Sequence, residues 1–153
     1  MKKKLLIFSI LCILIDQISK LLIVNSYDVN SGFSVIDGFF SITYIKNTGA
    51  AWGMFSNGTI ILSLISIVFL FFMIKYIYEL KKVSYLNVIS YGMLFGGIIG
   101  NLIDRLIRNY VVDFLNFNIF GYDFPVFNIA DCFIVISIIL IVIESWRDKS
   151  DSK

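Results

Sequence analysis

Two acidic residues, Asp113 and Asp131, lie in apolar and aromatic sequence, in the runs VVDFLNF and FNIADCF. A carboxylate in such surroundings is costly unless it is paired, so its presence calls for a role. Two carboxylates close together in a low dielectric cannot both ionise, so one keeps a proton. The ionised member can take a proton from water while the protonated member polarises a carbonyl, which is sufficient chemistry for amide hydrolysis. The residue types therefore predict an aspartyl catalytic pair, with a structural pair or an ion path as alternatives, because spacing alone does not bring the two together.

The remaining composition leaves few other routes to chemistry. The 153-residue chain has no histidine and only two cysteines. His-containing zinc sites, Ser-His-Asp triads and Cys-His dyads are therefore excluded, and two thiols do not make a structural metal site. We expect no cofactor and no metal. The 13 basic residues are spread along the chain and form no basic stripe, which argues against nucleic-acid binding.

Long apolar stretches predict an integral membrane protein. The chain is 58% hydrophobic and 16% charged, far outside the range of soluble globular proteins. Four stretches have the length of a membrane-spanning helix, and they cover residues of about 5–24, 59–78, 84–103 and 127–143. No small-x-small cleavage site follows the first stretch, so we interpret it as a span and not as a signal peptide. We expect a single integral membrane domain over residues 1–153.

The distribution of basic residues sets the expected orientation. Loops rich in Lys and Arg stay on the cytoplasmic side. Nine basic residues lie at the two termini or between the second and third stretches, whereas three lie at the opposite connections: Lys2, Lys3, Lys4, Lys75, Lys81, Lys82, Arg147, Lys149 and Lys153, against Lys46, Arg105 and Arg108. Both termini are therefore expected to be cytoplasmic.

The two outer connections contain β-like sequence. Residues 39–45 (FFSITYI) and 111–119 (VVDFLNFNI) are rich in β-branched and aromatic residues, which favour strands. We therefore expect an all-α membrane protein, with four transmembrane helices and a small extracytoplasmic β-layer on the membrane surface.

Several polar residues could support the aspartyl pair. Asp16 and Lys20 lie four apart on one face of the first predicted helix. Ionisable groups inside a membrane usually have a function, here either architectural support or direct contact with a substrate. Asn47 precedes the small residues of NTGAAWG, a pattern typical of a turn.

A glycine repeat precedes a second polar group. G-xxx-G-xxx-G over residues 92–100 predicts a tight contact between helices, which would press Asn101 against a neighbouring helix. Arg105 shares a helical face with Asn101, and its guanidinium could pair with a buried carboxylate or hold a lipid headgroup. Asn128 shares a face with Asp131 and could orient one member of the pair.

Together these segments resemble the lipoprotein signal peptidases, the signal peptidase II family. The resemblance covers nearly the whole chain, and the combination of motifs with four spans is highly specific. Five motifs carry it, in order: DQISK at 16–20, NTGAAWG at 47–53, GGIIGNLIDR at 96–105, VVDFLNF at 111–117 and FNIAD at 127–131.

The resemblance implies an aspartic endopeptidase of the bacterial plasma membrane. It would remove the signal peptide of a prolipoprotein just before a Cys that carries a diacylglyceryl group, at the extracytoplasmic face and in contact with membrane lipid. Family members are sensitive to globomycin, a cyclic peptide inhibitor. Matching motif to motif, the implied catalytic residues are Asp113 and Asp131, and the implied binding or supporting residues are Asp16, Lys20, Asn47, Asn101, Arg105, Asn128 and Ala130.

Two departures from the family pattern lie near the implied site. Trp52 stands where the family usually has Phe, and Cys132 follows the second aspartate. Both bear on inhibitor or substrate preference rather than on activity. Two functions of other classes compete with the peptidase. A channel or transporter subunit would need a polar relay across the membrane, and an enzyme acting on lipid headgroups would need a basic cluster beyond Arg105 and Arg108.

Overall fold

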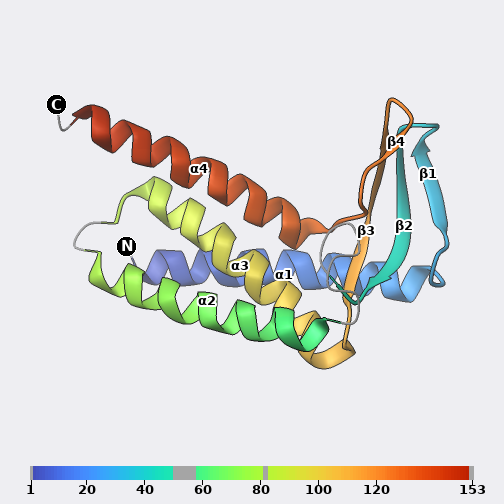
Figure 1. The fold of residues 1–153 in the computed structure, drawn as a ribbon, viewed down its shortest axis with the longest axis horizontal. Coiled ribbons are helices and arrows are strands. Elements are labelled where there is room, and N and C mark those ends of the chain that lie inside the picture. Colours follow the sequence, from blue (N-terminus) through green and yellow to red (C-terminus); the bar gives the residue numbers. More distant parts are fainter. Residues whose placement is uncertain (1, 50–57, 81–82, 152–153) are drawn as a thin grey trace.

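Four long apolar segments form the helices of the computed structural model, which describes residues 2–49, 58–80 and 83–151. They are α1 (Lys2–Ser26), α2 (Thr59–Glu79), α3 (Tyr85–Arg108) and α4 (Ile129–Asp151). All four are long and apolar enough to cross a membrane, and they extend along the length of the molecule (Figure 1). Their outer faces expose many large apolar side chains, a surface suited to lipid rather than to water.

Helix α3 is the centre of the bundle and contacts the other three helices. Its glycines allow this close approach. A Cβ atom at Gly96 would collide with Cys12 of α1, one at Gly100 would collide with the Asp16 carboxylate, and one at Gly97 would meet the backbone of α4. The tight helix contact predicted from the glycine repeat is confirmed, and it brings both α1 and α4 against α3, where they also meet each other through the Ala130 N–H and Asp16.

The helices are longer than the apolar stretches that predict them. Helix α3 begins after Ser84, whose side chain caps the helix by accepting from the Asn87 backbone N–H. It continues beyond residue 103 and ends at Asn109, which has a left-handed backbone (φ 63°). The additional turn pairs Asp104 with Arg108 on one helical face, an arrangement that favours helix although both residues are charged.

A four-stranded antiparallel sheet lies at one end of the bundle (Figure 1). Its strands, in spatial order, are β1 (Gly32–Ile36), β2 (Phe40–Asn47), β3 (Val111–Ile119) and β4 (Tyr122–Asp123). The strands predicted over 39–45 and 111–119 correspond to β2 and β3, whereas β1 and β4 were not predicted. Helix α1 begins and α4 ends at the far end of the molecule from this sheet.

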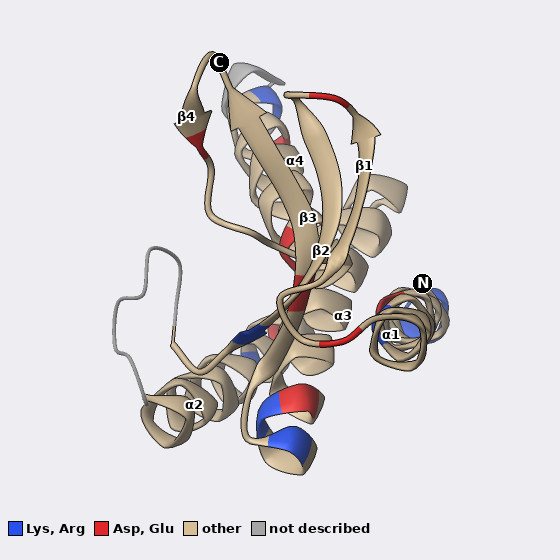
Figure 2. Cartoon of the chain, turned by 90° about the vertical axis from the view of Figure 1, so that its right-hand side faces the viewer, with Lys and Arg blue, Asp and Glu red and all other residues tan. Residues whose placement is uncertain are grey.

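Apolar contacts and backbone bonds fix the sheet to the helices. Ile23 of α1 packs in one cluster with Tyr44, Val112 and Phe114 of the sheet. The segment before α4 pairs with β3 through Phe127, whose carbonyl accepts from the Leu115 N–H at 2.8 Å. The start of α4 is thereby held against β3, and Figure 2 shows β3 crossing over the helix ends with an acidic position at the crossing.

Candidate active site

Asp113 lies on β3 and is almost completely buried, with 2% of its surface exposed. Both oxygens of its carboxylate accept hydrogen bonds from asparagine amides. Asn128 Nδ2 donates to one oxygen at 2.6 Å, and Asn47 Nδ2 donates to the other at 2.8 Å. Strand pairing explains the second contact, because Asp113 is paired with Ile45, two residues before Asn47.

Asp131 lies in the first turn of α4, and it lines the same cavity as Asp113. Its Oδ1 accepts from Asn101 Nδ2 of α3 at 2.8 Å. Its Oδ2 accepts from the Asn128 backbone N–H at 3.2 Å, while its own N–H donates to Asn128 Oδ1 at 3.0 Å. This reciprocal pair is the geometry of a helix capping box, so the residue that caps α4 also contacts both carboxylates.

The two carboxylates open into one cavity of about 650 Å³. Polar groups and apolar side chains from β2, α2, α3, β3 and α4 line it, among them Asn47, Ser66, Asn101, Arg105, Asp113, Asp131, Cys132 and Val135. Burial is the main cause that raises the pKa of Asp113 to about 7. The neighbouring Asp131 charge raises it further, against the opposing hydrogen bonds from Asn47 and Asn128. A carboxyl with that pKa can hold or release a proton near neutral pH.

Behind the two aspartates lies a buried ion-pair network. Lys20 Nζ is 2.9 Å from Asp16 Oδ2 and 3.3 Å from Asp104 Oδ2, and all three side chains are fully buried. The same ammonium donates to Asn101 Oδ1 at 2.8 Å. Asp16 also accepts from the Ala130 N–H at 3.0 Å. Asp16 and Lys20 are therefore paired as the sequence spacing predicts, and neither lines the cavity.

Asp104 joins helix α3 to strand β3, a contact that the sequence pattern does not predict. Its Oδ2 accepts from the Val112 N–H at 3.0 Å, and Arg108 pairs with its other oxygen. Since Val112 immediately precedes Asp113, Asp104 fixes the backbone of β3 next to the residue that carries the buried carboxylate. The available signal was the spacing of four residues between Asp104 and Arg108 within one helix.

Arg105 lines the cavity beside the aspartates. Within the described ranges, no carboxylate lies at ion-pair distance from its guanidinium, so of the two roles considered for Arg105, pairing with a buried carboxylate is not formed there. Asn47 is fixed by the Gly49 N–H, which donates to its Oδ1 at 2.9 Å. Trp52 and residues 50–53 of the NTGAAWG motif lie outside the described residues, as do Lys81 and Lys82.

No metal centre accompanies this arrangement among the described residues, where no three His, Cys, Asp or Glu side chains gather as a metal would require. The site therefore has two facing carboxylates, amide donors to each and one arginine. Such a set can activate water and protonate a leaving group.

Comparison with known proteins identifies the family. A model of signal peptidase (SPase) II matches residues 8–147. The chain belongs to the signal peptidase II family. It is 36% identical over 148 residues to a lipoprotein signal peptidase of Staphylococcus aureus (strain JH9), an alignment that covers 97% of this chain and 91% of the relative. The resemblance seen in the five motifs is confirmed.

Two solved structures described as bacterial membrane enzymes have the same fold as this family member. One superposes with a TM-score of 0.88 at 36% identity and covers 97% of this chain and 91% of the other. The second has a TM-score of 0.83 at 35% identity and covers 94% and 93%. The chain is a mostly helical, multi-pass membrane protein, and as a member of the signal peptidase II family it removes signal peptides from prolipoproteins.

Proposed function

We propose that this chain is an aspartic endopeptidase whose catalytic residues are Asp113 and Asp131. It cuts diacylglyceryl-modified prolipoproteins immediately before the lipidated Cys. One observation carries the proposal: both carboxylates open into the same cavity, and Asn128 bonds to each of them. The sequence has no histidine, so these carboxylates are its best acid–base pair for peptide hydrolysis.

The reaction follows from the paired carboxylates. The ionised aspartate takes a proton from water as the oxygen attacks the scissile carbonyl, and a tetrahedral intermediate forms. The protonated aspartate then gives its proton to the departing amine as the C–N bond breaks. The proton count of the pair is the same before and after. Arg105, in the same cavity, is placed to stabilise negative charge that develops on the carbonyl oxygen.

The supporting residues divide by what they touch. Asn47, Asn101 and Asn128 donate to the carboxylates and hold them in position. Asp16 and Lys20 support the site without lining the cavity. Asp16 accepts a hydrogen bond from the Ala130 N–H, and Lys20 donates one to Asn101.

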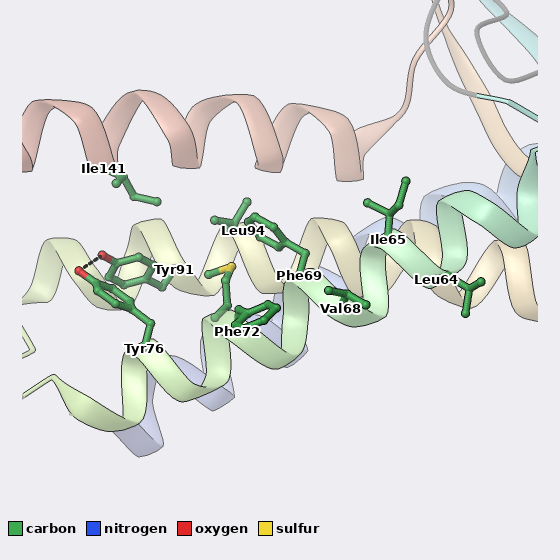
Figure 3. Close-up of a pocket in the computed structure, with 10 residues that line it drawn as sticks. Leu64, Ile65, Val68, Phe69, Phe72, Tyr76, Tyr91, Leu94 and Ile141 are labelled. Atoms are coloured by element: carbon green, nitrogen blue, oxygen red, sulfur yellow. Dashed lines mark hydrogen bonds between the residues drawn. The ribbon is translucent and has the colours of Figure 1, made fainter.

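An apolar groove is the proposed seat of the signal peptide. A second cavity of about 730 Å³ lies between α2, α3 and α4, lined among others by Val68, Phe69, Tyr91, Leu94 and Ile141 (Figure 3). It follows the catalytic cavity along the same three helices: Ile65 lines the groove and the adjacent Ser66 lines the catalytic cavity. An apolar signal helix fits this lining, with the substrate's acyl chains remaining in membrane lipid.

The proposed orientation places the sheet and the aspartates at the extracytoplasmic face of the bacterial plasma membrane. The four helices cross as one integral domain, and both termini are cytoplasmic. Supporting this, Lys2, Lys3 and Lys4 begin α1 at the end of the molecule far from the sheet. The catalytic cavity is also the proposed site for inhibitors of the globomycin type.

A single assay tests the proposal. Purified protein in detergent is offered the same prolipoprotein with and without its diacylglyceryl group, and the products are identified by mass spectrometry. We expect cleavage of the lipidated form only, with the lipidated Cys as the new N-terminus. Equal cleavage of both forms, or a cut elsewhere, contradicts the assigned substrate.

A further inference from the structure

The Asn101 side chain links a buried positive charge to one catalytic carboxylate. Its Oδ1 receives the Lys20 ammonium at 2.8 Å, and its Nδ2 donates to Asp131 at 2.8 Å. A lysine ammonium has donors and no acceptor, so the amide oxygen must face Lys20. The orientation of Asn101 is thereby fixed, and the ammonium polarises the N–H that reaches Asp131.

The other carboxylate connects to Asn101 less directly, through Asn128, whose Nδ2 donates both to Asp113 at 2.6 Å and to Asn101 Oδ1 at 3.1 Å. The amides that donate to Asp113 are those of Asn47 and Asn128, and their own oxygens accept from neutral backbone N–H groups, of Gly49 and Asp131 respectively. Asp131 also lies in the first turn of α4, where the helix dipole favours a negative charge. The two members of the pair are thus unequal.

Charge balance gives the pair one proton. The charged groups of this region come from α1, α3, β3 and α4, and the Cys132 thiol lies beside them. Three are cations, Lys20, Arg105 and Arg108, and four are carboxylates, Asp16, Asp104, Asp113 and Asp131. In a low dielectric an unbalanced charge is costly, and the group is neutral when the pair holds a single proton.

We infer that Lys20, acting through Asn101, decides which aspartate carries that proton. This rests on the proposed catalytic pair. Lys20 keeps Asp131 ionised as the base that takes the proton of water, and the proton stays on Asp113, the acid that gives it to the departing amine. Lys20 is a positioning residue and not a catalytic one, because it is fully buried and does not line the cavity.

Infrared spectroscopy of Asp113→Asn isolates the titration of Asp131 without any need for catalysis. The band of protonated Asp131 is identified because it is absent from the double variant Asp113→Asn/Asp131→Asn. The readout is the pH at which half of this band has disappeared. Two changes are introduced separately into the Asp113→Asn protein. Lys20→Met with Asp16→Asn removes the link to Asn101 but keeps the net charge of the network. Arg108→Gln removes a cation but keeps the link.

The two changes distinguish an effect of the Lys20–Asn101 link from an effect of the net charge of the network. We expect Lys20→Met/Asp16→Asn to move the midpoint upward by about one pH unit or more, in the range that a neighbouring charge causes, and Arg108→Gln to leave it nearly unchanged. If Arg108→Gln shifts it and the charge-balanced change does not, the net charge of the network decides and the inference is wrong. Asn101→Leu, which cuts the link at its other end and leaves the ion pairs intact, must reproduce the upward shift, and no shift there also overturns the inference.

A cleavage assay on the same proteins separates the inference from the proposed function. With Asp113 present, Lys20→Met/Asp16→Asn should move the acidic limb of the pH–rate profile to higher pH, and Arg108→Gln should not. If Asp113→Asn still cleaves, the catalytic pair is wrong whatever the infrared midpoints show. If Asp113→Asn is inactive and Lys20→Met/Asp16→Asn does not change the infrared midpoint of Asp131, the catalytic pair stands and only the role of Lys20 is wrong.

Discussion

Asn128 and Asp131 bond to each other twice, backbone N–H to side-chain oxygen in each direction, at 3.2 and 3.0 Å. The same Asn128 donates from its Nδ2 to Asp113 at 2.6 Å. One residue therefore begins helix α4, holds one carboxylate through its backbone and holds the other through its side chain. The helix cap and the geometry of the two carboxylates are one structure here.

Asn128→Ala should therefore lose both functions together. We expect the rate of cleavage to fall by about 10²-fold or more, as when one donor to a charged group is removed from an active site, and stability to fall by about 1 kcal/mol for the lost cap. Peptide cleavage and thermal unfolding in detergent measure the two effects. Asn118→Ala is the matched control, because Asn118 likewise donates its side-chain amide to an aspartate, Asp123, away from the cavity.

Asp113→Asn and Asp131→Asn should each abolish cleavage and leave the protein inserted in the membrane. The amide keeps the size of the carboxyl but can neither take nor give the proton. Processing of a lipidated substrate in membranes measures this, with Asp123→Asn on exposed β4 as a control that should remain active. Near-normal processing by either Asp113→Asn or Asp131→Asn would remove that residue from the catalytic pair.

The pH dependence of stability should report Asp113. Its pKa is raised in the folded state from 3.8 to about 7, so protonation favours folding. The stabilisation is present in full below about pH 4 and is lost as the pH rises through 7. Replacing the group with Asn removes this loss, so the melting temperature of Asp113→Asn relative to the parent should rise between pH 4 and pH 7 and then level. The pH-dependent part of the unfolding free energy that Asp113 contributes is at most about 4 kcal/mol. A difference in melting temperature between the two proteins that does not depend on pH would show that Asp113 ionises normally.

The apolar groove gives a prediction about substrate affinity. Val68→Trp should fill part of it and raise KM for a full-length signal peptide by about tenfold, equivalent to about 1.4 kcal/mol of binding free energy, with little change in kcat. Ile67→Trp, on the neighbouring exposed position of α2 outside the groove lining, is the matched control. Equal effects of the two substitutions would place the signal peptide elsewhere.

The glycine contact between α1 and α3 predicts a structural defect. A methyl group at Gly100 would collide with the Asp16 carboxylate, which cannot easily move because Lys20 and the Ala130 N–H hold it. Gly100→Ala should therefore destabilise the protein by about 1–3 kcal/mol. Thermal unfolding checks this against Ser90→Ala, which removes a buried hydroxyl bonded within the same helix and should cost less.

Sequence predicts the parts of this molecule whose signals are local. Apolar length indicates the four helices, and the high content of β-branched and aromatic residues indicates β2 and β3. Strand β1 escapes prediction because all five of its residues are exposed and impose no burial pattern, and β4 has only two residues. Helix α3 extends past its apolar stretch because its last charged residues pair with one another and with α1.

The site is predictable in its members but not in its connections. Asp113 and Asp131 stand out as acids in apolar sequence, and Asp16 and Lys20 as a pair at helical spacing. That Lys20 reaches Asn101, or that Asp104 holds the strand at Val112, depends on how closely α1 and β3 approach α3. Such contacts between distant segments leave no periodic signal in a single sequence.

The asparagines and aspartates of the proposed site are supplied by segments far apart in the chain, from Asn47 to Asp131, with Lys20 behind them. During synthesis the last of them, Asp131, leaves the ribosome after three helices have already been made. A nascent chain therefore has no complete site, although its own first helix is a basic, apolar N-terminal segment of the kind such an enzyme meets in substrates. Under the proposed function, proteolytic activity begins only when the fourth helix docks, which makes assembly itself the activation step.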